Sequence, residues 1–197
     1  MSAAAASDSE ARTLSGRDEV LGAFEQFREH LDEHYDRRER LIKASRDVTN
    51  LSKKVIFLLH RLMTEDASDA RKAARCGREK LKEVQDIYAG MAEDGEFEGE
   101  RFWRYQNQVS PGLQEYIEAL AYAHYLEYET LITFGEVQRT ISKEDGTPYF
   151  PLTTSDYLLG ISDLTGELMR FAISSISRRE GRKKAVEICA FVRNCKA

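Results

Sequence analysis

The stretch RERLIKASRDVTNLSKKVIFLLHR, residues 38–61, decides the fold, because its apolar residues recur mostly at steps of three, four and seven. This spacing places them on one face of an α-helix. The stripe starts near Val20, and nothing interrupts it between residues 23 and 63. A helix over that span is about 60 Å long at 1.5 Å per residue. The pattern therefore predicts a bundle with one long edge, or a helix that packs against other subunits.

The remainder of the chain is also predicted to be helical, with short turns between the helices. Further helices are expected at residues 66–91, 100–131 and 133–141, from Thr153 onward, and from residue 185. A kink or short break is expected at Pro111 inside the third of these segments. No segment alternates with period two for long enough to form a strand. The fold class is therefore all-α, an elongated bundle of about six to seven helices with a long first helix.

The two ends of the chain differ from its middle. Residues 1–16 are small and polar, and they are predicted to be a disordered tail. Residues 17–197 are predicted to form one helical domain, whose last helix is cut short. A length of 197 residues with 42% hydrophobic and 32% charged residues suits a soluble, helix-rich domain. No run of residues approaches the length of a membrane span.

The net charge and the cysteines exclude some classes of function. A formal net charge of −5 argues against indiscriminate binding to nucleic acid, which normally needs a basic surface. The three cysteines lack metal-ligand spacing and are expected to be reduced thiols: Cys76, Cys189 and Cys195. No glycine-rich phosphate loop is present.

Two closely spaced pairs of carboxylates suggest a metal site. Glu115 and Glu118 lie three residues apart in GLQEYIEA, and Asp163 and Glu167 lie four apart in SDLTGELMR. Residues at these spacings share one face of a helix, so each pair directs two negative charges the same way. If the pairs face each other, an all-oxygen site of this kind suits Mg²⁺ or Mn²⁺ better than zinc. Such a metal site predicts hydrolysis of a phosphodiester or phosphoanhydride.

The alternative is that these acids are solvated charges on helix surfaces. The chain has 34 Asp and Glu residues, and pairs such as Glu79 and Glu83 have the same spacing without suggesting a site. The two candidate pairs differ because apolar residues surround them and Gly112, Gly160 and Gly166 lie beside them. Small residues allow a backbone or a substrate to come close. A di-iron site is disfavoured, since neither Glu118 nor Glu167 is followed by a histidine three residues later.

Basic residues along the first helix are candidates for binding RNA phosphates. The candidates are Arg46, Lys53, Lys54 and Arg61, which recur at steps of seven or eight. A solvated helix flank paired with nearby acids is the favoured explanation for them. The aromatic residues Phe102, Trp103 and Tyr105 could stack on bases, although aromatics at helical spacing more often belong to a core.

Three blocks of the sequence resemble the translin superfamily, and within it the translin-associated factor X (TRAX) branch. They are RERLIKASRDVTNLSKKVIFLLHR at 38–61, GLQEYIEAL at 112–120 and DYLLGISDLTGELMR at 156–170. The blocks occur in the order typical of the family, and the resemblance covers roughly residues 17–193. The acids of the second and third blocks are what favour the TRAX branch over translin itself, which lacks the full set.

The resemblance implies an all-helical protomer that joins translin in a hollow, barrel-like hetero-oligomer. It also implies a Mg²⁺-dependent endoribonuclease that cleaves single-stranded RNA, for example in passenger-strand removal during RNA silencing or in processing of tRNA precursors. The catalytic acids of the family fall on Glu115, Glu118 and Asp163, with Glu167 as a fourth acid of the same cluster. Activity is expected only in the complex with translin.

Two differences from the family pattern affect these expectations. Members of the branch usually continue with another long C-terminal helix, and many carry a basic nuclear-targeting stretch near the N-terminus. Residues 1–16 contain only Arg12 as a basic residue, so a location in cytoplasm and nucleus is expected with import that depends on the partner. Two other functions stay open: a non-catalytic scaffold of translin, and a protein that binds single-stranded nucleic acid without cleaving it.

Overall fold

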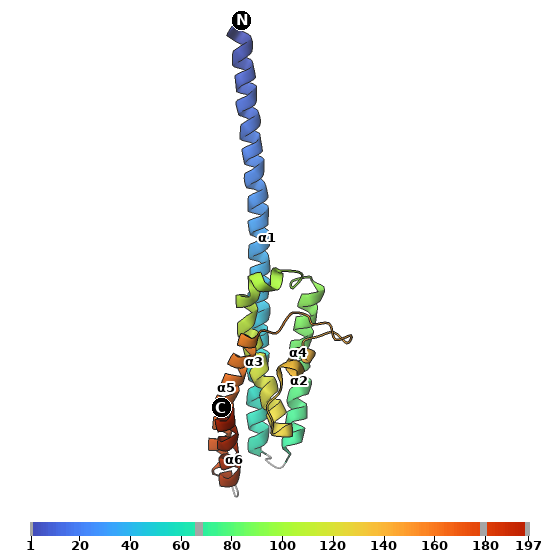
Figure 1. Ribbon diagram of the computed structural model, residues 1–197, viewed down its shortest axis with the longest axis vertical. Coiled ribbons are helices and arrows are strands. Elements are labelled where there is room, and N and C mark those ends of the chain that lie inside the picture. The colour runs from blue at the N-terminus through green and yellow to red at the C-terminus, as the bar shows by residue number, and fades with distance from the viewer. Residues whose placement is uncertain (1, 66–68, 178–180, 196–197) are drawn as a thin grey trace. The chain divides into compact units, whose positions relative to one another are not determined.

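Helices make up nearly all of the computed structural model, which describes residues 2–65, 69–177 and 181–195, with the side chains of residues 17–64, 69–177 and 181–195 (Figure 1). The helices are α1 (Ser2–Glu65), α2 (Ala70–Glu93), α3 (Arg101–Tyr128), α4 (Phe134–Thr140), α5 (Thr154–Ser175) and α6 (Gly181–Asn194). Within these ranges no strand forms, and an isolated bridge joins Ser142 to Pro148. The all-α prediction with a long first helix is confirmed.

The chain divides into two units, residues 1–40 and residues 41–197. In the first unit, large apolar side chains of the helix are between 52% and 66% exposed: Val20, Leu21, Phe24, Phe27, Leu31 and Tyr35. The sequence pattern therefore identifies an apolar face, but no described residue covers it. The structure places residues 2–16 in α1, and the predicted disorder of residues 1–16 stays a prediction.

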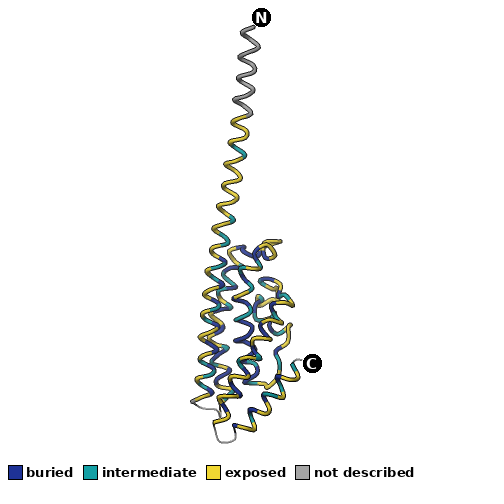
Figure 2. Tube along the Cα trace, turned by 90° about the vertical axis from the view of Figure 1, so that its left-hand side faces the viewer, coloured by how far each residue is buried: buried dark blue, intermediate teal, exposed yellow. Residues whose placement is uncertain are grey.

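The second unit contains the hydrophobic core. Helix α3 packs against α2 and α5, and α6 packs against α5. Helix α1 contributes Leu41, Val48, Val55 and Leu59 to this core, at the steps that the sequence predicts. Figure 2 shows the buried stretches of the helices in dark blue.

Local chemistry sets several helix ends. Thr133 caps α4 through a capping box with Glu136, as the sequence predicts, and Thr153 caps α5. Helix α2 begins later than predicted, because the side chain of Asp69 accepts a hydrogen bond from the backbone N–H of Lys72. The predicted start of this helix, residue 66, lies outside the described residues.

The prediction of a short break at Pro111 is wrong, and the last helix begins earlier than predicted. Helix α3 continues through Pro111 without a break, and the next residue, Gly112, donates its N–H to the Ser45 hydroxyl of α1 at 3.1 Å. This bond gives a partner to an N–H group beside the proline. Helix α6 begins at Gly181, four residues before the predicted start at residue 185.

Close backbone contacts at two glycines bring the helices of the candidate site together. A Cβ atom on Gly112 would lie 2.7 Å from the Ser45 carbonyl oxygen, and one on Gly160 would lie 2.7 Å from Ile117 Cβ. These distances are too short for any larger residue without movement of a helix. Gly112 therefore permits the contact between α1 and α3, and Gly160 permits the contact between α3 and α5.

Candidate metal centre

All four predicted acids line one pocket of about 600 Å³ between α1, α3 and α5. Glu115 and Glu118 enter it from α3, and Asp163 and Glu167 enter it from α5. The other residues lining this acidic pocket are Lys53, Ile56, Phe57, Ser162, Thr165, Gly166 and Arg170. The structure thus brings together two pairs of carboxylates that are 45 or more residues apart in the chain.

Hydrogen bonds one to two turns before these acids fix the contact between α3 and α5. Asp156, near the start of α5, is buried and accepts hydrogen bonds from Gln114 Nε2 at 2.8 Å and Ser110 Oγ at 3.1 Å. Gln114 directly precedes Glu115, and Asp156 lies two turns before Asp163. These bonds hold the register of the two helices, so the acids meet at the same level of the bundle.

Glu118 is the buried member of the four acids. Its residue is only 9% exposed, and it makes no hydrogen bond or ion pair with any residue that the structure describes. Burial, joined by the charges of Glu115, Glu167 and Asp163, raises the pKa of Glu118 to about 7, against a smaller opposite effect of Lys53. A carboxylate in such surroundings is stabilised by any cation that enters the pocket.

Two cationic side chains partly balance the other acids. Lys53 Nζ lies 3.0 Å from Glu115 Oε1, and Arg170 Nη1 lies 3.4 Å from Glu167 Oε2. Both cations are more than half exposed, so these ion pairs are screened by water and contribute little to stability. They leave Glu118 without a direct partner.

A histidine and a tyrosine lie behind Glu167. His60 Nε2 on α1 is 2.5 Å from Glu167 Oε2, and His60 Nδ1 is 3.2 Å from the hydroxyl oxygen of Tyr122 on α3. Tyr122 is fully buried, and burial raises the pKa of its hydroxyl, which therefore stays protonated. The sequence analysis missed this contact, because His60 and Glu167 are 107 residues apart and no local pattern pairs them.

The residues present fit a hard divalent cation by their chemistry. Four carboxylates offer only oxygen ligands, which Mg²⁺ and Mn²⁺ prefer. Among the described residues, however, no three His, Cys, Asp or Glu side chains are grouped closely enough to hold a metal ion. Two of the acids are engaged elsewhere, since Glu115 pairs with Lys53 while Glu167 contacts His60 and Arg170. A metal ion would have to replace some of these contacts.

The predicted RNA-binding residues do not form one row. Lys53 belongs to the acidic pocket, whereas Lys54 and Arg61 line a separate pocket, and the exposed Arg46 lines neither. Of the predicted stacking aromatics, Phe102 and Tyr105 are buried in the core, while Trp103 is 57% exposed. Within the described residues, no helix is long and apolar enough to cross a membrane.

Comparison with known proteins agrees with the fold and the sequence blocks. Residues 36–197 match the Translin family. The chain is 37% identical over 176 residues to translin-associated protein X of Mus musculus, covering 80% of this chain and 59% of that protein. It is 30% identical to the translin-associated protein X homolog of Schizosaccharomyces pombe, covering 79% of this chain and 62% of that protein.

More distant relatives share the fold. Translin of Mus musculus is 26% identical over 160 residues, covering 80% of this chain and 69% of that protein. The crystal structure of apo-NeC3PO superimposes with a TM-score of 0.53 at 16% identity, covering 87% of this chain and 92% of the other. The chain thus spans about three fifths of the length of the two translin-associated protein X relatives. It belongs to the translin family, and within that family it is more similar to translin-associated protein X than to translin.

Proposed function

We propose that this chain is the metal-binding, catalytic subunit of an endoribonuclease that cleaves single-stranded RNA in a hetero-oligomer with translin. The observation that carries the proposal is Glu118, a buried carboxylate that pairs with no described residue and lines a pocket with three more acids. If the four acids were only solvated surface charges, nothing would require them to line the same pocket. An inert core would be more stable with an apolar residue at this position.

The acids have distinct roles in this proposal. Glu115, Glu118 and Asp163 hold Mg²⁺, and Glu167 is a further ligand or orients the attacking water. Bound Mg²⁺, for which Mn²⁺ can substitute, supplies charge neutralisation at the scissile phosphate and a lower pKa for a bound water. His60 fixes the rotamer of Glu167 from behind. Lys53, released from Glu115, attracts the phosphate at the rim of the pocket.

The partnership with translin is supported by the exposed apolar side chains of α1. Phe24 is 66% exposed and Phe27 is 60% exposed, and their edge-to-face contact at 6.4 Å between ring centroids covers neither ring. Exposed apolar patches of this kind mark interaction sites. Processing of tRNA precursors and removal of passenger strands in RNA silencing are the physiological reactions proposed for the complex.

The test uses this chain co-expressed with translin and a fluorescently labelled single-stranded RNA. Glu118→Gln keeps the shape of the side chain but removes its charge, and we expect it to reduce Mg²⁺-dependent cleavage at least about 100-fold. Glu79→Gln is the matched control, since Glu79 is an exposed acid on α2 that does not line the pocket. Chelation of the metal with EDTA should abolish cleavage by the wild-type complex. Cleavage by Glu118→Gln at the wild-type rate would rule the acids out.

A second function, a non-catalytic scaffold of translin, is favoured by two observations. Lys53 already neutralises Glu115, and the described acids are not grouped as a finished metal site. In that case Mg²⁺ and Mn²⁺ change neither the melting temperature nor the cleavage activity of the complex, while Glu118→Gln leaves assembly intact. The metal titration therefore distinguishes the two functions.

A further inference from the structure

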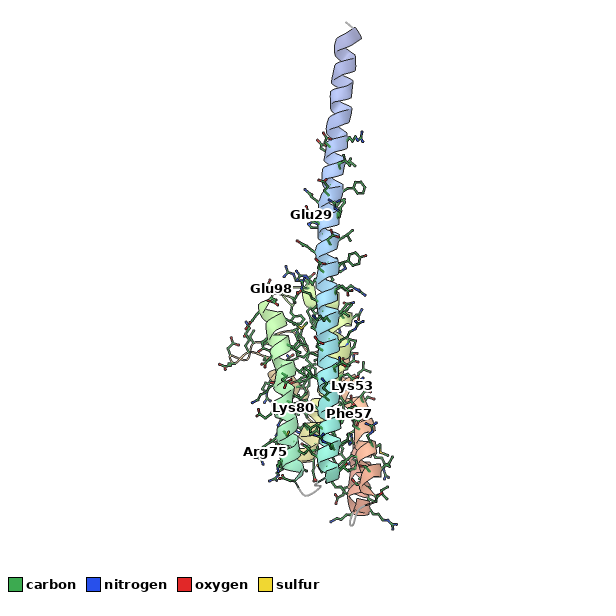
Figure 3. The ribbon with its side chains drawn as sticks, turned by 180° about the vertical axis from the view of Figure 1, so that it is seen from behind. Glu29, Lys53, Phe57, Arg75, Lys80 and Glu98 are labelled. Atoms are coloured by element: carbon green, nitrogen blue, oxygen red, sulfur yellow. The ribbon has the colours of Figure 1, made fainter. Side chains whose placement is uncertain are left out.

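A second pocket, of about 630 Å³, lies next to the acidic pocket on the other side of α1. Its wall consists of Leu51, Lys54, Val55, Phe57, Leu58 and Arg61 from α1 and of Lys80 and Glu83 from α2. Figure 3 shows Phe57 and Lys53 on α1, with Lys80 on α2 at a similar level of the bundle. We call this the basic pocket, because three of its residues are cationic and one is anionic.

Phe57 is the shared wall of the two pockets. Successive helical residues are rotated by about 100°, so Lys53 and Lys54 diverge, and Phe57 projects between them one turn later. Its side chain is 65% exposed. A large aromatic ring in this position is not needed for the core, and its face is open to a ligand.

The charge changes sign across Phe57. On one side, four acids share the acidic pocket with two cationic residues, Lys53 and Arg170. On the other side, neither Lys54 nor Lys80 makes an ion pair with any described residue, whereas Lys53 is paired with Glu115. Ammonium groups without an anionic partner at the rim of a pocket attract phosphate.

We propose that the basic pocket binds a nucleotide next to the scissile phosphate of single-stranded RNA. The base stacks on Phe57, and its phosphate pairs with Lys54 and Lys80. The volume suits one nucleotide, since small-molecule sites measure about 300–1,000 Å³. Stacking on an aromatic ring is tolerant of sequence, so this contact supports cleavage without base specificity. The assignment rests on the proposed ribonuclease function and names the substrate contact that the acids themselves cannot provide.

Stacking can be measured directly, because Trp103 is the single tryptophan of the chain. In the full 197-residue chain, the double variant Trp103→Phe with Phe57→Trp carries one tryptophan, at the proposed stacking site. We expect oligoadenylate to quench the fluorescence of this double variant in buffer with EDTA, and to leave the fluorescence of the wild-type chain, which reports Trp103, unchanged. Absence of quenching in the double variant with saturating oligonucleotide would overturn the proposal.

Binding in EDTA gives the second measurement, with labelled oligouridylate and the full chain. Phe57→Ala and the double change Lys54→Glu with Lys80→Glu should each weaken binding about tenfold or more, since stacking contributes about 1–3 kcal/mol per base. The charge change should also reduce the dependence of binding on salt. The matched controls Tyr128→Ala and Lys43→Glu change an exposed aromatic ring and an exposed lysine outside both pockets, and they should bind as wild type does.

These outcomes separate the nucleotide site from the cleavage reaction. A chain that shows quenching and Phe57-dependent binding but no cleavage keeps the basic pocket and loses the ribonuclease proposal. A complex that cleaves RNA while Phe57→Ala binds it normally keeps the ribonuclease and loses the pocket. If Phe57→Ala binds RNA normally but no longer associates with translin, the pocket is a protein interface and the nucleotide proposal is wrong.

Discussion

His60 Nε2 on α1 lies 2.5 Å from Glu167 Oε2 on α5, although the two residues are 107 positions apart. An ionised carboxylate can only accept a hydrogen bond, so Nε2 carries the hydrogen in this contact. In the neutral imidazole Nδ1 then accepts the hydrogen of the Tyr122 hydroxyl. This chain of contacts fixes one carboxylate of the acidic pocket from the interior of the bundle.

Loss of this support should weaken metal binding. Partners behind a metal ligand typically contribute about 10–100-fold in affinity. We therefore expect His60→Ala to weaken Mn²⁺ binding about tenfold or more by calorimetry, and His60→Gln, which can still donate to Glu167, to recover most of it. His124→Ala is the control, since His124 contacts Thr130 and lines another pocket. Equal Mn²⁺ affinity in all three variants would contradict a positioning role for His60.

The contact between α3 and α5 should not tolerate a methyl group at Gly160. A Cβ there would lie 2.7 Å from Ile117 Cβ and 2.9 Å from the Gln114 carbonyl oxygen. We expect Gly160→Ala to lower the free energy of unfolding by about 1–3 kcal/mol. Gly166→Ala, on the same helix with nothing within 4 Å of the new Cβ, should raise it by about 0.5–1 kcal/mol. Chemical denaturation measures both, and equal values would show that α3 and α5 are not closely packed.

The stability of the metal-free chain should fall as the pH rises. The pKa of Glu118 is about 7 in the folded chain, above its ordinary value of 4.5. The folded state therefore holds a proton that the unfolded state has lost between these pH values, and stability decreases across that window. The loss is about 2 kcal/mol after allowance for solvent screening.

The variant Glu118→Gln isolates this effect, because it has no proton to lose at this position. The free energy of unfolding of the variant minus that of the wild type should grow from pH 4.5 to pH 7 and stay constant above it. Saturating Mg²⁺ should stabilise the wild type and not the variant. A difference that does not vary with pH would show that Glu118 is well solvated.

The exposed face of α1 should be needed for association with translin. Phe24→Glu with Phe27→Glu places two charges among side chains that are already exposed, so the stability of the chain itself should change little. After co-expression, we expect the fraction of this chain that is found in the complex with translin, measured by light scattering, to fall about tenfold. Val186→Glu on α6 is the control, since Val186 is equally exposed in another helix. Unchanged assembly would assign the contact to another surface.

Local patterns predicted much of the fold. The capping box of Thr133 and Glu136 and the cap at Thr153 involve residues three apart, so the sequence contains all of their chemistry. The break at Pro111 was predicted wrongly, because the partner of the neighbouring N–H group is Ser45, 67 residues away on α1. Tertiary contacts of this kind leave no local pattern.

For the candidate site, the sequence predicted the four acids but not the residues that contact them from other helices. The spacing within each pair of acids indicated which helix faces carry them. Gly112 and Gly160 indicated close helices, whereas nothing lies within 4 Å of a Cβ on Gly166. His60 could not be found in this way, since one histidine among apolar residues is usually a core residue. Lys80 and Phe57 were also missed. The basic pocket forms between α1 and α2, and no local sequence pattern shows which residues of two helices meet.

The burial of Glu118 has an evolutionary consequence. A buried charged group lowers the stability of the fold. Such a group is therefore retained only where selection for function offsets the lost stability. A homologue that retained the assembly without the proposed reaction could carry glutamine or leucine at this position. Such a replacement would raise the stability of the folded chain. If the proposed reaction depends on Glu118, the residue at this position should therefore distinguish homologues that cleave RNA from homologues that do not.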